Sequence, residues 1–147
     1  MKKYVIDTNC LISFVTDRNT DQQQRMAAVL EAASQLRCTL ICPQHVLTEF
    51  VFVMDRVYQI SKPVIGATIR DFVSMPGIEI RHEIDFSTIL TLWPTAVPDF
   101  GDAIVAAVCK SIKGSAVITF DTKFKASLRK AGIAVLEGDF SMSAGRE

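Results

Sequence analysis

The chain has 147 residues, of which 49% are hydrophobic and 22% are charged. This composition is typical of a globular protein that buries a core without disulfides, so we expect a single domain over residues 1–147, with a poorly ordered tail after about residue 138. The 16 basic and 16 acidic residues cancel. Net charge therefore points to neither a nucleic acid nor a membrane as the partner.

The sequence also argues against export and membrane insertion. No run approaches the ~20 apolar residues that a membrane-spanning helix needs. Asp7 and Asn9 interrupt the apolar segment that a secretory signal would require. Cys38 and Cys42 would share one face of a strand, either as buried thiols or as part of a zinc site. We expect reduced thiols and a cytoplasmic location.

Short β-prone apolar runs alternate along the chain with segments of helical periodicity. Strands are predicted over 3–6, 38–42, 78–81, 115–119 and 133–136. Helices are predicted over 8–15, 22–36, 43–58, 64–73, 86–93 and 100–113, with one more after residue 121. Pro43 is expected in the first turn of its helix. The strand over 78–81 alternates apolar and polar residues, as an exposed or edge strand does. The whole pattern favours the α/β class.

Two of the predicted strands stop at an aspartate. The first run ends at Asp7, near the start of the chain, and a later run ends at Asp121, near its end. Sheets of α/β proteins place their ligand sites at the carboxyl ends of the strands, so the two side chains are candidates for one acidic site. The alternative is that each aspartate only caps the helix that follows it.

Three more acids occupy positions from which they can join such a site. Glu49 lies at the edge of the apolar face of its helix, where it could also be an ordinary flanking acid paired with Arg56 or Lys62. Asp99 and Asp102 open a helix rich in small apolar residues, where the helix dipole alone favours acids. Because that helix is apolar nearly all round, we expect its acid to face a cleft or a counter-charge.

The four acids directed to this edge are Asp7, Glu49, Asp102 and Asp121. Two unit charges ~4 Å apart cost about 4 kcal/mol at an effective dielectric near 20, so protons or a cation must neutralise some of them. Ligands that are all oxygens suit a hard ion, Mg²⁺ or Mn²⁺, and Asp99 is a further candidate ligand. Such an ion in a strand-end cleft suits phosphate chemistry. His45 and His82 are interpreted as surface or capping residues.

Basic residues gather in one stretch near the C-terminus. Against a single acid, the stretch 110–130 contains Lys110, Lys113, Lys123, Lys125, Arg129 and Lys130. This excess could hold a phosphate backbone beside the acidic site, with Lys110, Lys113, Lys123 and Lys125 as the candidate RNA-binding residues. The alternative is an ordinary solvated helix face.

Four segments together resemble the PIN-domain ribonucleases. They are Val5–Ile12 (VIDTNCLI), Glu49 on an apolar helix after a proline, Asp99–Ala103 (DFGDA) before an alanine-rich helix, and Thr119–Phe124 (TFDTKF). Their order, their spacing and the chain length are most similar to the VapC-type toxins of bacterial and archaeal toxin–antitoxin pairs. The resemblance covers essentially the whole chain.

The resemblance implies a three-layer α/β/α fold whose central parallel sheet has four or five strands, with the acidic site at their carboxyl ends. It also implies metal-dependent endonucleolytic cleavage of RNA, a homodimer, and a cognate antitoxin that blocks the acidic pocket. By the same resemblance, Mg²⁺ or Mn²⁺ would be held by Asp7, Glu49, Asp102 and Asp121, with Asp99 at a position that is often acidic and as a further candidate ligand. The supporting polar residues would be Thr8, Asn9 and Thr119.

Three other functions stay open from the sequence. The chain could be a housekeeping RNA-processing nuclease of the same fold. It could be a non-catalytic domain that binds RNA or a protein, although an idle cluster of like charges would only destabilise the fold. Asp7 could also be a phospho-accepting nucleophile, but Asn9 stands where aspartyl phosphatases usually carry a second aspartate.

Overall fold

A computed structural model describes residues 1–138, and the tail predicted to be poorly ordered lies outside the described residues. The strands are β1 (Lys2–Ile6), β2 (Cys38–Pro43), β3 (Ile78–Arg81) and β4 (Ala116–Ile118). The helices are α1 (Thr8–Val15), α2 (Thr20–Ser34), α3 (Gln44–Arg56), α4 (Lys62–Val73), α5 (Phe86–Leu92), α6 (Phe100–Ser111) and α7 (Thr122–Lys130). Within the described residues, none of these helices is long and apolar enough to cross a membrane.

The four strands form one parallel sheet in the order β3-β2-β1-β4. The chain first adds β2 and β3 on one side of β1, and then places β4 on the other side. The strand order therefore reverses between β1 and β4. At such a reversal a crevice opens beyond the carboxyl ends of the strands, because the helices that follow them leave toward opposite faces of the sheet.

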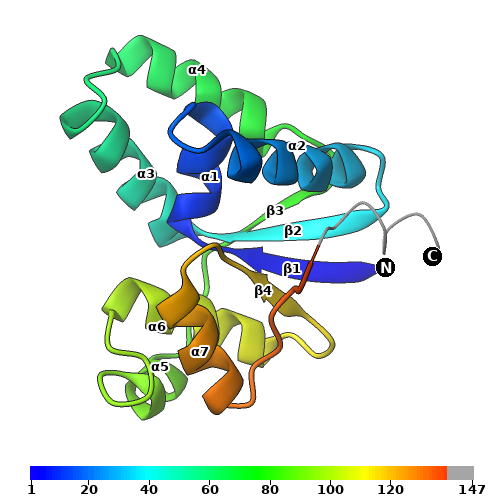
Figure 1. Cartoon of the computed structure of the whole chain (residues 1–147), viewed down its shortest axis with the longest axis vertical. Helices are drawn as coiled ribbons and strands as arrows, with labels where there is room; N and C mark the ends of the chain where they lie inside the picture. The colour runs from blue at the N-terminus through cyan, green and yellow to red at the C-terminus, as the bar shows by residue number, and fades with distance from the viewer. Residues whose placement is uncertain (139–147) are drawn as a thin grey trace.

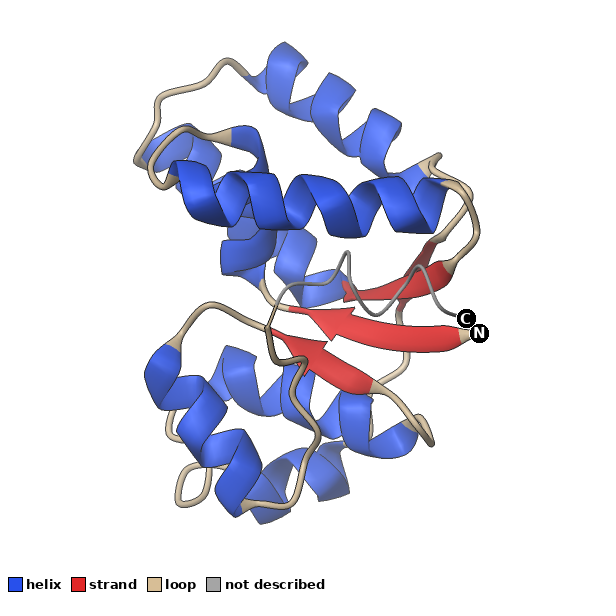
Figure 2. Cartoon of the chain, turned by 45° about the vertical axis from the view of Figure 1, so that its right-hand side comes forward, coloured by secondary structure: helices blue, strands red, loops and turns tan. Residues whose placement is uncertain are grey.

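Helices cover both faces of this sheet. Figures 1 and 2 show α1 to α4 on one side of the strands and α5 to α7 on the other. The central strands are accordingly apolar on both faces, and Val5, Ile41 and Val117 are completely buried. The three-layer α/β/α fold predicted from the sequence is therefore confirmed, with a sheet of four strands.

The predicted strand over 133–136 is the main difference from the sequence-based expectation. It is reduced to a single bridge beside β4, between Val135 and Val117. The Val117 N–H donates to the Ala134 carbonyl and the Leu136 N–H donates to the Val117 carbonyl, each at 2.9 Å. The strand that it accompanies, β4, itself has only three residues.

Two helix starts also differ from the prediction. Helix α2 begins at Thr20, two residues early, because the Asn19 side chain accepts a hydrogen bond from the Gln22 N–H at 3.0 Å and caps the helix there. Pro43 is not in the first turn of α3 but is the last residue of β2, with an extended backbone. The predicted edge position of the strand over 78–81 is confirmed, since β3 is at one end of the sheet.

Candidate active site

A cavity of about 260 Å³ opens at the carboxyl ends of β1 and β4, where the strand order reverses. Five carboxylates line it, and we call it the acidic cavity: Asp7, Glu49, Asp99, Asp102 and Asp121. Thr8 and Asn9 complete its polar wall. Among the residues that the structure describes, no lysine, arginine or histidine lines it. The structure thus brings together all five acids that the sequence had singled out.

Asp7 is the most buried of these acids, with only 4% of its surface exposed. Strand β4 pairs with β1 so that Ile118 is opposite Ile6, which places the next residues, Thr119 and Asp7, side by side. The Thr119 hydroxyl donates to Asp7 Oδ2, and the Cys10 N–H donates to Oδ1 at 3.1 Å. These two bonds fix the orientation of the carboxylate.

Capping and lining the cavity are not exclusive roles. Asp7 and Asp99 each accept a backbone hydrogen bond that caps α1 or α6. Asp121 caps α7 through its Oδ1, which accepts from the N–H groups of Lys123 at 2.9 Å and Phe124 at 3.1 Å. Each of these aspartates therefore satisfies a helix N-terminus while it also lines the acidic cavity.

Glu49 reaches the cavity from α3, on the opposite face of the sheet from α6. The Thr8 hydroxyl donates to its Oε1 at 2.6 Å. The alternative pairing with Arg56 is not observed, since that guanidinium lies 3.6 Å from Asp55 instead. A Cβ placed on Gly101, in the first turn of α6, would lie only 2.9 Å from Glu49 Oε2. A larger residue at position 101 would therefore force the Glu49 carboxylate to move.

His45 was interpreted from the sequence as a surface or capping residue, and that interpretation is wrong. Its side chain is only 21% exposed, and its Nε2 lies 3.0 Å from the Gly101 carbonyl and 3.9 Å from Glu49 Oε1. Burial lowers the pKa of the imidazole, although the nearby Glu49 carboxylate opposes that shift. The available signal was the spacing of four residues to Glu49, which puts both side chains on one face of a helix.

His82, by contrast, lies at the surface. It is exposed, as the sequence predicted, and its Nδ1 lies 2.8 Å from Gln44 Oε1 at the start of α3.

Crowding of the acids changes how they hold protons. The pKa of Asp102 is raised from 3.8 to about 7, first by burial and then by the charges of Asp99, Asp7, Asp121 and Glu49. Burial also raises the pKa of Asp7, against the lowering effect of the hydrogen bonds from Thr119 and Cys10. Protonation is therefore one way in which the metal-free cavity relieves its repulsion.

A hard divalent cation is the other way, and the donor chemistry of the cavity suits it. Within residues 1–138, no group of three acids, histidines or cysteines is arranged to hold a metal ion on its own. Several carboxylate oxygens are instead engaged by N–H and hydroxyl donors. Mg²⁺ usually keeps several waters and takes only one or two carboxylates directly. The cavity therefore fits a hydrated ion better than an all-protein cage.

The zinc alternative at the cysteines finds no support in the described residues. Cys38 and Cys42 are both free and buried in β2. Burial raises the pKa of Cys38 to about 11 and that of Cys42 to about 12. Free buried thiols of this kind are typical of structural core residues.

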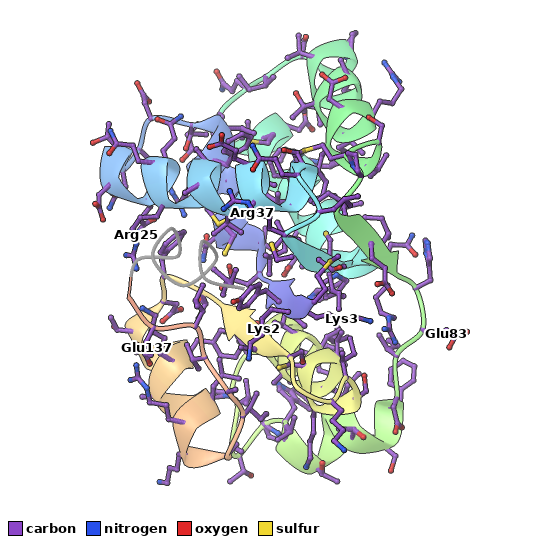
Figure 3. The ribbon with its side chains drawn as sticks, turned by 90° about the vertical axis from the view of Figure 1, so that its right-hand side faces the viewer. Lys2, Lys3, Arg25, Arg37, Glu83 and Glu137 are labelled. Carbon is purple, nitrogen blue, oxygen red and sulfur yellow. The ribbon has the colours of Figure 1, made fainter. Side chains whose placement is uncertain are left out.

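The basic residues that the sequence placed beside the acids are divided by the fold. Lys110 is in the last turn of α6, and Lys113 follows that helix, while Asp102 is in its first turn. Lys113 borders a surface depression together with Lys2 and Lys3. Lys2 and Lys3 are at the amino end of β1 (Figure 3). Lys110 and Lys113 therefore lie toward the amino ends of the strands, whereas the acidic cavity is at their carboxyl ends.

Lys123 and Lys125 are on the same side as the acids. Both are in α7, immediately after the capping Asp121, and Lys123 is exposed. Farther along the helix, Arg129 pairs with Glu137, and the hydrogen bond from the guanidinium lowers the pKa of that carboxyl. Of the four candidate RNA-binding lysines, two thus lie close to the cavity.

The fold and this cavity define a class of protein: a parallel α/β domain with an acid-lined crevice at the reversal of strand order. Comparison with protein families shows which family of this class the chain belongs to. The PIN domain matches residues 4–127, and the chain belongs to the PIN domain family. PIN domains are generally nucleases that hydrolyse phosphodiester bonds, and they generally use divalent metal ions. Comparison with curated proteins finds no match.

Proposed function

We propose that this PIN domain is a divalent-metal-dependent endoribonuclease and that it is the toxin of a toxin–antitoxin pair. The observation that carries the proposal is the acidic cavity, in which five carboxylates gather without a basic residue of the described chain in the wall. Such a cluster destabilises the fold unless a cation or protons neutralise it. A metal-dependent reaction gives the cluster a purpose that a purely structural role does not.

In this proposal the metal is Mg²⁺ or Mn²⁺. When bound, it would supply positive charge to the phosphodiester and lower the pKa of the attacking water. The residues that would hold it, directly or through water, are Asp7, Glu49, Asp102 and Asp121, with Asp99 as a further candidate. The hydroxyls of Thr119 and Thr8 orient the Asp7 and Glu49 carboxylates in advance. These side chains therefore need to move little as negative charge develops on the reacting phosphodiester.

The proposed substrate is single-stranded or looped RNA, because splayed strands reach a crevice between helices more easily than a rigid duplex does. Lys123 and Lys125, beside the cavity, would contact the phosphates next to the cleaved bond. Lys110 and Lys113 could contact RNA only where the strand extends toward the opposite edge of the sheet.

Cleavage of RNA with Mn²⁺, with a chelator and with the Asp7→Asn variant tests the metal mechanism. We expect chelation and the substitution each to abolish cleavage. Asp17→Asn, in the exposed loop after α1, is the matched control and should cleave as the unaltered protein does. Undiminished cleavage by Asp7→Asn or in the presence of chelator would refute the mechanism.

Expression in bacteria tests the role as a toxin. Induced expression should arrest growth, the Asp7→Asn variant should not, and co-expression of a small neighbouring gene product should relieve the arrest. Cleavage in vitro without growth arrest would favour the housekeeping nuclease instead. RNA binding without turnover under any divalent ion would favour the non-catalytic alternative. We also propose that the protein is a homodimer, and light scattering would test this.

An apolar cleft supports a protein partner. It has a volume of about 280 Å³, lies between α1, α3 and α4, and is lined mainly by apolar side chains such as Leu11, Leu47 and Phe72. Helices α1 and α3 also carry Thr8 and Glu49 of the acidic cavity. We propose that the antitoxin places apolar side chains in this cleft and a basic side chain among the acids. Ile69→Lys, which is in this cleft and outside the acidic cavity, should leave cleavage intact and prevent relief by the antitoxin.

A further inference from the structure

His45 connects the two helices that bring acids to the cavity from opposite faces of the sheet. It is the second residue of α3, one helical turn before Glu49. Its Nε2 lies 3.0 Å from the Gly101 carbonyl, in the first turn of α6. Because a carbonyl oxygen only accepts hydrogen bonds, Nε2 must carry the proton in this contact. Within residues 1–138 this is the one hydrogen bond between α3 and α6.

The same residue of α6 also lies close to Glu49. A Cβ on Gly101 would lie 2.9 Å from Glu49 Oε2 and 3.2 Å from Asp99 Oδ1. Asp102 follows directly, and its N–H is held by Asp99 Oδ1 at 2.9 Å. The carboxylates on the two helices repel each other, so an attractive contact at this point opposes their separation.

Packing alone does not explain a histidine at this position. The second ring nitrogen, Nδ1, is buried and has no hydrogen-bond partner among the described residues. A buried polar atom without a partner is destabilising, and an apolar ring would avoid that loss. The remaining reason for an imidazole is the hydrogen bond that Nε2 donates from α3 to α6.

We propose that His45 is a positioning residue that sets the distance between Glu49 on α3 and Asp102 on α6 by donating its Nε2 proton to the Gly101 carbonyl. Its role is to hold the carboxylates at the spacing that a divalent ion requires, without itself touching ion or substrate. This inference rests on the proposed metal-dependent function. Residues that orient metal ligands typically change metal affinity by about 10- to 100-fold when substituted.

Two amide substitutions separate this role from general packing. The side-chain nitrogen of His45→Gln occupies about the place of Nε2 and can still donate to Gly101. The side chain of His45→Asn is shorter. Its amide nitrogen corresponds to Nδ1 and does not reach the Gly101 carbonyl. His82→Asn is the control, because His82 contacts the first turn of the same helix but does not line the acidic cavity.

The measurements are Mn²⁺ affinity by titration calorimetry and the Mn²⁺ concentration for half-maximal RNA cleavage, both well below the melting temperature of each variant. We expect His45→Asn to weaken Mn²⁺ binding by about tenfold or more, with the half-maximal concentration rising in parallel. His45→Gln and His82→Asn should stay near the unaltered protein. Gly101→Ala should weaken Mn²⁺ binding as well, because its Cβ displaces Glu49.

The outcomes distinguish the failure of this inference from the failure of the proposed function. If the unaltered protein binds Mn²⁺ and cleaves RNA but His45→Asn does both equally well, the positioning role is refuted while the nuclease stands. Equal losses in the Asn and Gln variants would also refute it, because they would indicate packing. If the unaltered protein neither binds Mn²⁺ nor cleaves RNA, the proposed function and this inference fail together.

Discussion

Substituting Asp102 by Asn should stabilise the metal-free protein at high pH while it abolishes cleavage. The fold raises the pKa of this carboxyl from 3.8 to about 7, chiefly through burial and the neighbouring acids. A shift of about three units corresponds to about 4 kcal/mol in full. Asp102 is only half-buried, so screening by solvent reduces the expected effect to about 1–2 kcal/mol.

The sign follows from the direction of the shift. Between about pH 4 and pH 7 the folded protein retains a proton that the unfolded chain has released. Stability from this group is therefore fully present below about pH 4 and is lost as the pH rises through about 7. Asparagine is neutral throughout. The Asn variant should match the unaltered protein near pH 4 and exceed it at pH 8.

Thermal unfolding with chelator at pH 4.5, 6 and 8 measures this difference. A gain of about 1–2 kcal/mol corresponds to a melting temperature higher by about 2–8 °C at pH 8 for a chain of this size. Saturating Mn²⁺ at pH 8 should reverse the order, because ligand binding stabilises only the protein that can hold the ion. Asp17→Asn, away from the cavity, serves as the control. An Asn variant less stable at pH 8, or a difference independent of pH, would show that Asp102 is not under repulsion.

The remaining predictions concern RNA contacts, the buried aspartate and the core. In an inactive background, Lys123→Gln should lower the slope of log RNA affinity against log salt concentration by about one unit, measured by fluorescence anisotropy. Lys113→Gln should leave this slope unchanged. The reverse result would place the RNA at the opposite ends of the strands. Asp7→Ala should be less stable to urea than Asp7→Asn by about 1–3 kcal/mol, because it leaves the buried Thr119 hydroxyl without its acceptor and the Cys10 N–H with only the backbone carbonyl of residue 7; equal stability would contradict this. Leu128→Ala, at a completely buried site, should lower the free energy of unfolding by about 2–5 kcal/mol without altering Mn²⁺ affinity, and a loss of affinity would contradict the separation of core and site.

Local features of this protein follow from the sequence alone. The acids at the ends of apolar runs and the elements around them are determined by contacts within a few residues, as the caps of α1, α6 and α7 show. Hydrophobic periodicity gives the elements, and their alternation gives the α/β class. Acids at the carboxyl ends of parallel strands lie on one side of a sheet, so the location of the candidate site could also be predicted from the sequence.

Contacts between distant segments were decided only by the tertiary structure. The hydroxyl of Thr119 meets Asp7 because β4 pairs with β1 in one register, and nothing near either residue encodes that pairing. His45 reaches Gly101 because α3 and α6 approach across the crevice. Lys110 lies eight residues beyond Asp102 on a helix that rises about 1.5 Å per residue, so it is about 12 Å farther from the cavity along the helix axis. Asp102 and Lys110 are near each other in sequence, so a count of charges along the chain groups them together. They lie near opposite ends of the strands because α6 runs along the sheet between them.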